Sequence, residues 1–123
     1  MFENKNCVKI GVVGSRSFND YGRLCSVLDA LDLSCADVVV SGGCSKGADA
    51  LAEYYAKSRG LDLKVFRADW KKYGNVAGII RNRTLVKFCD FVVLFWDGYS
   101  RGTGSTLRIC LEEKVPFLVV WKK

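Results

Sequence analysis

Five short apolar runs alternate with segments of helical periodicity along the 123-residue chain. The runs are VKIGVVG (8–14), DVVVSG (37–42), LKVF (63–66), FVVLFW (91–96) and FLVVW (117–121). Because they are continuously apolar, they are typical of parallel strands that are covered on both faces. We therefore predict a five-stranded parallel sheet.

Four helices are predicted between these strands. The first has Asn19 or Asp20 as its N-cap and the second ends at Gly60. Apolar residues recur at i, i+3, i+4 and i+7 at Leu24, Val27, Leu28 and Leu31, and again at Ala48, Leu51, Ala52 and Tyr55. The third helix is expected within 75–88 and the fourth from about 105 to 114. Right-handed crossovers then favour a single α/β domain over 1–123, Rossmann-like and three-layered, with strand order 3-2-1-4-5.

The composition is that of a globular protein, with half of the residues hydrophobic and about a quarter charged. No apolar run is long enough to span a bilayer, and the N-terminal residues do not resemble a secretory signal. We expect a cytoplasmic protein with no membrane partner.

The chain has no histidine, which excludes Ser-His and Cys-His catalysis. No C-x-x-C motif occurs, so we predict buried free thiols and no metal site. The cysteines concerned are Cys7, Cys25, Cys35, Cys44, Cys89 and Cys110.

The net charge of +6 is concentrated in residues 57–87, which hold nine Lys or Arg and two Asp. Such a local excess favours an anionic partner, namely a nucleotide, RNA or DNA. Solvated surface lysines explain most of these charges equally well.

Three loops that combine glycines, hydroxyls and a cation follow the first, second and fourth strands. They are 14–17, 41–47 and 97–106, and the predicted strand order brings them together at the carboxyl edge of the sheet. Glycines let the backbone approach a ligand, and helix N-terminal amides, hydroxyls and cations bind phosphate oxygens. We favour a ligand site over turn geometry alone. Its predicted residues in and beside these loops are Gly14, Ser15, Arg16, Gly42, Gly43, Ser45, Lys46, Gly47, Asp49, Trp96, Asp97, Gly102, Thr103, Gly104 and Ser105. Trp70, Arg81 and Asn82, which lie outside the loops, complete the predicted set.

Known phosphate-binding motifs do not fit these loops. Residues 42–47 have the G-x-x-x-x-G spacing, but Ala48 and Asp49 follow where a Walker A motif needs Lys and Ser/Thr. No G-x-G-x-x-G follows the first strand. Asp49 either contacts the ligand or favours the helix dipole and caps loop amides.

Two further features allow alternative interpretations. Trp70 or Tyr73 either stacks on a base or anchors packing ahead of a helix. Arg81 and Arg83 are about 200° apart on a helix, so only one of them can face the crevice.

The segments GVVGSRSF, SGGCSKGADALA, ADWKKYGNVAGIIRN and FWDGYSRGTGST resemble the YspA-like group of the SLOG superfamily, in order over roughly 9–120. The resemblance implies a Rossmann-like domain that binds nucleotides or nucleotide derivatives. It also places the glycine-rich loops and Arg81-Asn82 around the site. Related domains often pair, which leaves a homo-oligomer open.

Two relatives of this group suggest different activities. The LOG phosphoribohydrolases carry G-G-x-G-T-x-E-E, and aligning 102–105 on it places Leu107 and Arg108 where the two glutamates belong. This departure argues against that activity, so no catalytic residue is assigned. DprA, which loads recombinase onto single-stranded DNA, has similar G-S-R, S-G-G-x-x-G-x-D and R-N-R segments.

Three hypotheses follow. The first is a protein that binds a nucleotide-type small molecule as a sensor, carrier or sequestering module, with no certain cofactor. The second is an enzyme that cleaves an N-glycosidic or phosphate bond with Asp49, Asp69 or Asp97. The third, ranked lower, is DprA-like binding of single-stranded nucleic acid.

Overall fold

The computed structural model describes residues 7–34 and 37–121. Five parallel strands form one sheet in the order β3-β2-β1-β4-β5. The strands are β1 (Lys9–Gly14), β2 (Val38–Ser41), β3 (Asp62–Val65), β4 (Phe91–Trp96) and β5 (Phe117–Trp121). The predicted fold class and strand order are therefore confirmed.

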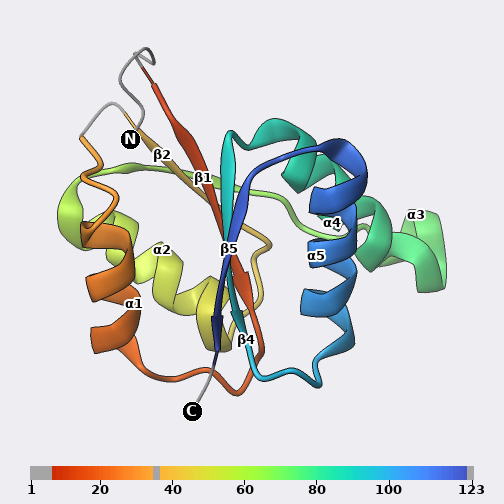
Figure 1. The fold of residues 1–123 in the computed structure, drawn as a ribbon. Coiled ribbons are helices and arrows are strands. Elements are labelled where there is room, and N and C mark those ends of the chain that lie inside the picture. The colour runs from red at the N-terminus through yellow and green to blue at the C-terminus, as the bar shows by residue number, and fades with distance from the viewer. Residues whose placement is uncertain (1–6, 35–36, 122–123) are drawn as a thin grey trace.

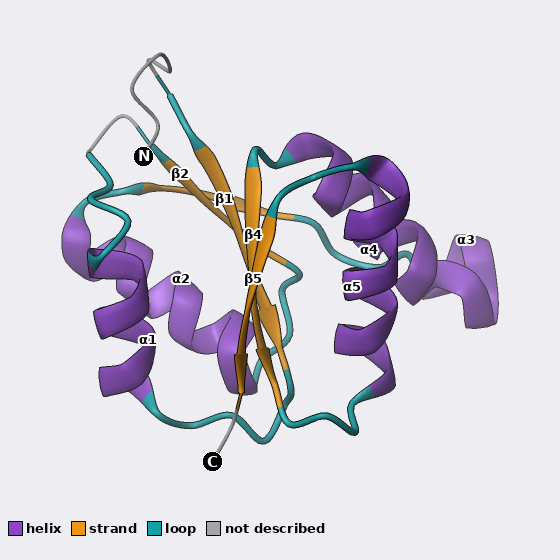
Figure 2. Ribbon diagram, viewed as in Figure 1, coloured by secondary structure: helices purple, strands orange, loops and turns teal. Residues whose placement is uncertain are grey.

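Helices cover both faces of the sheet (Figure 1). The α1 (Tyr21–Asp29) and α2 (Gly47–Arg59) helices lie on one face, and α4 (Ala77–Phe88) and α5 (Arg101–Glu113) lie on the other. A short α3 (Trp70–Tyr73) and a 3-10 turn, η1 (Gly74–Val76), precede α4. Figure 2 shows the resulting helix–sheet–helix layers.

Alternate strand residues enter two separate cores, which explains why the strands are continuously apolar. Val12, Val39 and Phe95 pack against α1 and α2. Val13 and Val40 face the other way, toward α4 and α5. The central strands are thus buried on both sides, and their carboxyl ends are fixed relative to one another.

Two helical predictions need correction. The last helix begins at Arg101, four residues earlier than expected, because Ser100 caps it; the Oγ of Ser100 accepts the N–H of Thr103 at 3.5 Å. The α3 helix was not predicted, because its four residues are too few to show a period. At α1, Asp20 is the N-cap, and Gly60 ends α2 in the left-handed conformation with φ of 69°.

Candidate functional site

A cavity of about 490 Å³ opens at the carboxyl edge of the sheet, and we call it the inner chamber. It lies where the segments after β1, β2 and β4 meet α4. Glycines, hydroxyls, two arginines and two aspartates make up most of its lining. The lining residues are Val13, Gly14, Ser15, Arg16, Ser17, Gly42, Cys44, Asp49, Arg81, Asn82, Asp97, Ser100, Gly102, Thr103 and Thr106.

Hydrogen bonds hold the segment after β1 against the end of β4 and form a turn between Ser15 and Phe18. The backbone N–H of Ser15 donates to the carbonyl of Phe95 at 3.0 Å, and the Ser15 carbonyl accepts from Phe18 N–H at 3.1 Å. The Ser15 hydroxyl accepts from the Asp97 N–H at 3.3 Å. This network leaves Arg16 exposed at the rim, where its guanidinium makes no hydrogen bond or ion pair within the described part of the chain.

The segment after β2 folds around buried polar side chains. The Ser41 hydroxyl accepts from Gly43 N–H at 3.0 Å and donates to Glu53 at 3.0 Å. Gly47 has φ of +72°, and a Cβ there would overlap the Ser15 carbonyl. The start of α2 therefore packs directly on the loop after β1, and only glycine permits this contact.

Asp49 lies at the wall of the inner chamber and is 8% exposed. Its Oδ2 accepts the N–H of Cys44 at 3.2 Å, so it caps a loop amide. Burial raises the pKa of its carboxyl to about 6, against the lowering effects of the Cys44 hydrogen bond and of Arg81. The chamber thus holds a carboxyl group that titrates just below neutral pH.

Arg81 and Arg83 have opposite roles. Arg81 donates to the carbonyl of Gly42 at 2.5 Å and to Oδ1 of Asn82 at 2.8 Å, which positions its guanidinium in the inner chamber. Arg83 pairs with Glu112 at 2.7 Å and Glu113 at 2.6 Å on α5. The expectation that only one arginine faces the crevice is met, and Glu112 is exposed on the surface.

The segment after β4 ends in a tight turn that begins α5. Oδ1 of Asp97 accepts the N–H groups of Ser100 and Tyr99, both at 2.8 Å, and these bonds lower the pKa of its carboxyl. The first turn of α5, with Gly102 and Thr103, lines the inner chamber. The Ser100 hydroxyl caps the Thr103 amide, and the amides of this turn carry the positive end of the helix dipole.

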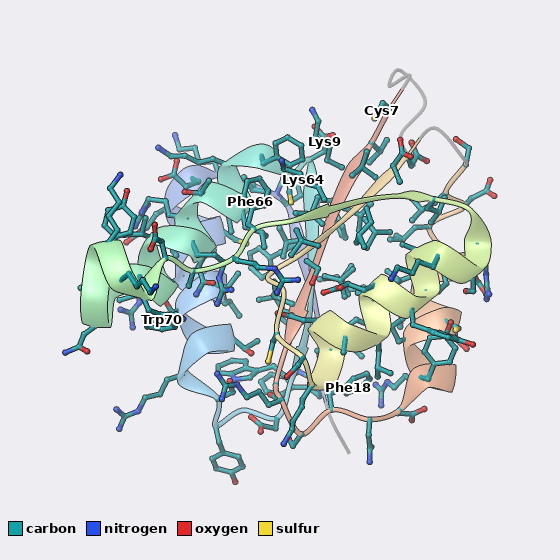
Figure 3. All side chains as sticks on the ribbon, turned by 180° about the vertical axis from the view of Figure 1, so that it is seen from behind. Cys7, Lys9, Phe18, Lys64, Phe66 and Trp70 are labelled. Atoms are coloured by element: carbon teal, nitrogen blue, oxygen red, sulfur yellow. The ribbon has the colours of Figure 1, made fainter. Side chains whose placement is uncertain are left out.

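A second cavity of about 880 Å³ adjoins the first, and we call it the outer chamber. The two chambers share Arg16, Arg81, Asn82, Ser100 and Gly102. The remaining lining residues of the outer chamber are Trp70, Asn75, Gly78, Ile79, Trp96, Tyr99, Arg101, Gly104, Ser105 and Arg108. Trp70 is 58% exposed. It lies on α3, away from the sheet (Figure 3).

The predicted site residues divide among these cavities. The inner chamber is lined by Gly14, Ser15, Arg16, Gly42, Asp49, Arg81, Asn82, Asp97, Gly102 and Thr103. Four other predicted residues line the outer chamber but not the inner one: Trp70, Trp96, Gly104 and Ser105.

Four predicted residues of the segment after β2 are placed elsewhere. Gly43 and Ser45 line a separate hollow of about 390 Å³ beside α2. Lys46 is the exposed N-cap of α2, and Gly47 supports the site through its backbone.

Sequence reasoning missed several lining residues. Ser100 and Thr106 lie within the loop 97–106, but they line the inner chamber only because α5 starts at Arg101. Once this start is known, the helical spacing of Thr103 and Thr106 places both on one face. The same helical spacing places Arg101 and Arg108 on one face of α5, at the outer chamber.

The cysteines are free where the structure describes them, but they are not uniformly buried. Cys89 and Cys110 are buried, Cys25 and Cys44 are half-buried, and Cys7 is exposed, contrary to expectation. Cys35 lies outside the described residues. Over 7–34 and 37–121, no helix is long and apolar enough to cross a membrane.

The fold and the convergent loops define a Rossmann-like domain with a polar cavity at the carboxyl edge of its sheet. The sequence profile of the YspA, cpYpsA-related SLOG family (YAcAr) matches residues 8–73. The chain belongs to this family, which confirms the resemblance found in its loops. It is also 30% identical over 117 residues to the Gene 61 protein of Mycobacterium phage D29, covering 89% of this chain and 94% of the phage protein.

Two solved structures share the fold. DNA processing protein A (DprA) from Streptococcus pneumoniae has a TM-score of 0.77 at 20% identity. DprA from Helicobacter pylori, described for its single-stranded DNA binding mode, has a TM-score of 0.72 at 18% identity. Each match covers 94% of this chain, but only 51% and 66% of the respective DprA chains.

Proposed function

We propose that the chain binds a nucleotide or nucleotide-derived small molecule at the carboxyl edge of the sheet. The observation that carries the proposal is that three glycine- and hydroxyl-rich segments line one chamber together with Arg16 and Arg81. Backbone amides at a helix N-terminus and guanidinium groups both favour phosphate oxygens. Binding without turnover fits a sensor, carrier or sequestering module.

The positions of the two arginines favour an anionic ligand. Arg81 is held by its bonds to Gly42 and Asn82, so little side-chain entropy is lost when an anion binds. Arg16 is free to close on the ligand from the rim. Thr103 and Ser15 lie among the hydroxyl donors of the lining and suit phosphate or sugar oxygens.

Calorimetry with a panel of mono-, di- and cyclic nucleotides and ADP-ribose derivatives tests the proposal. We expect saturable binding of at least one phosphorylated compound and none of the matching nucleoside without phosphate. The absence of heat with every compound, on protein shown to be folded by circular dichroism, would refute it.

Hydrolysis is a second candidate, because Asp49 is a buried carboxyl group with a raised pKa at the wall of the chamber. Asp97 is occupied by backbone amides, and Asp69 is the exposed N-cap of α3. Incubation with nucleoside monophosphates, followed by chromatography for free base or phosphate, distinguishes the two functions. Turnover that is lost in Asp49→Asn would favour the enzyme.

Single-stranded nucleic acid is a third candidate, supported by Trp70, Lys71 and Lys72, which are exposed together on α3. A strand would bind with an affinity that increases with its length and falls steeply with salt. A mononucleotide that binds as well as a long strand would support the first proposal instead.

A further inference from the structure

The outer chamber differs from the inner chamber in its charges. The inner chamber has Asp49 and Asp97 beside its two arginines. The outer chamber has four arginines and no carboxylate among its described lining residues. An electropositive cavity of this kind attracts a group with net negative charge.

Arg101 and Arg108 supply the cations that are specific to the outer chamber. Both are exposed, and neither makes a hydrogen bond or ion pair through its side chain within 7–34 and 37–121. Two arginines away from the chambers are paired with carboxylates: Arg59 contacts Asp29 at 3.2 Å, and Arg83 contacts two glutamates. The two cavity arginines therefore have donors available for a ligand.

The geometry of α5 places these arginines on one face. Arg101, Gly104 and Arg108 are spaced i, i+3 and i+7 along the helix. Gly104 lies against Trp96, where a Cβ would be 3.1 Å from the indole ring, and Trp96 is fixed by its N–H bond to the Ser100 carbonyl at 2.9 Å. The arginines thus flank a stretch of helix that is held closely over an indole.

Trp70 and Ile79 supply an exposed apolar part of the lining of the outer chamber. Trp70 of α3 is 58% exposed, and its ring lies next to Gly78 at the start of α4. Ile79, which is 53% exposed, continues this wall. An exposed indole beside an aliphatic side chain suits the face of a planar ring.

We propose that the ligand is a nucleotide derivative with two separate anionic groups rather than a nucleoside monophosphate. One group lies in the inner chamber by Arg16 and Arg81. The base stacks on Trp70 in the outer chamber, and Arg101 and Arg108 bind the second anionic group. This inference rests on the proposed nucleotide-binding function and specifies the class of ligand.

A matched ligand pair tests the proposal by calorimetry. For each of the four common nucleosides, the 5′-monophosphate is compared with the 3′,5′-bisphosphate. We expect at least one bisphosphate to bind about ten-fold more tightly than its monophosphate. In the Arg101→Ala/Arg108→Ala variant the ratio of the two affinities should fall to about one.

Arg23→Ala is the control, because it removes a cation from α1 that lines neither chamber. It should leave both affinities unchanged. Equal affinity of the wild-type protein for the monophosphate and the bisphosphate would overturn the two-group ligand but not the proposed nucleotide binding. Loss of the bisphosphate's advantage in Arg23→Ala would do the same. No binding of any nucleotide would overturn the proposed function as well. Affinity that increases with the length of an oligodeoxynucleotide would overturn the two-group ligand in favour of a strand.

Discussion

The two chambers are built from different parts of the polypeptide. The inner chamber is formed mainly by the segments that follow β1, β2 and β4, where glycines at the ends of parallel strands let these segments meet around polar side chains. The outer chamber is lined mainly by residues of α3, α4 and α5, several of them exposed. Changes in the inner chamber should therefore affect folding and binding together, whereas changes in the outer chamber should affect binding alone.

The largest effect is expected for Gly47→Ala. The new Cβ would overlap the Ser15 carbonyl at a residue with φ of +72°, so the start of α2 must separate from the loop after β1. We expect a loss of roughly 3 kcal/mol or more in the free energy of unfolding, measured with urea, together with loss of nucleotide binding.

Gly60→Ala is the matched control. Gly60 has φ of +69° but no atom within 4 Å of the added Cβ. It should cost only about 1 kcal/mol and leave binding intact. Equal losses in the two variants would show that the contact between loops is not the cause.

Arg81→Ala should weaken nucleotide binding by about thirty-fold, which corresponds to roughly 2 kcal/mol for a charged hydrogen-bonding partner. Calorimetry with a ligand that binds the wild-type protein measures this. Arg83→Ala removes a cation from the same helix but from the opposite side, where it contacts Glu112 and Glu113. An equal loss in this control would contradict the placement of the site.

Trp70→Ala should weaken ligand binding by about ten-fold, because stacking of a base on an aromatic ring contributes roughly 1–3 kcal/mol. Its thermal stability should be unchanged, since Trp70 is 58% exposed. Tyr54→Ala, which removes another exposed aromatic residue that lines neither chamber, is the comparison. Unfolding of the Trp70 variant would indicate that the indole is a packing anchor instead.

Asp49→Asn should change how stability depends on pH. The pKa of Asp49 is about 6 in the folded protein and 3.8 for an unperturbed aspartate, so between these values the folded state binds more protons than the unfolded state. The free energy of unfolding therefore decreases as pH rises through this window, by about 1 kcal/mol between roughly pH 5 and pH 7. The neutral asparagine lacks this contribution.

Urea unfolding of both proteins at the two pH values isolates the effect, because titration of other groups cancels in the difference. The wild-type protein should lose more stability than the variant on going to the higher pH. Parallel changes in the two proteins would show that Asp49 titrates normally.

The sequence predicts the strand order because the five strands are continuously apolar and the crossovers are right-handed. The sequence also predicts that only one of Arg81 and Arg83 faces the crevice, but helical spacing does not say which one. The contact between Arg81 and the Gly42 carbonyl in the structure identifies Arg81. Helical periodicity cannot show where α5 begins, because Gly102 and Gly104 look like loop residues. The outer chamber was therefore only partly predicted, and Arg108 was missed.

The segment after β2 shows a second limit of sequence reasoning. Its glycines indicate a ligand loop, yet Lys46 is exposed and Gly47 packs on a neighbouring loop. Glycine for close packing and glycine for ligand approach have the same sequence pattern. Only the three-dimensional contacts distinguish them.

Amide chemical-shift mapping during a nucleotide titration tests the central claim most directly. The account predicts that the largest shifts fall on the amides of Gly14, Ser15, Gly42, Gly102 and Thr103, all of which line the inner chamber. The exposed outer face of α1 should show none. Shifts centred on α1, or no shifts with any nucleotide that is tested, would contradict a nucleotide site at the carboxyl edge of the sheet.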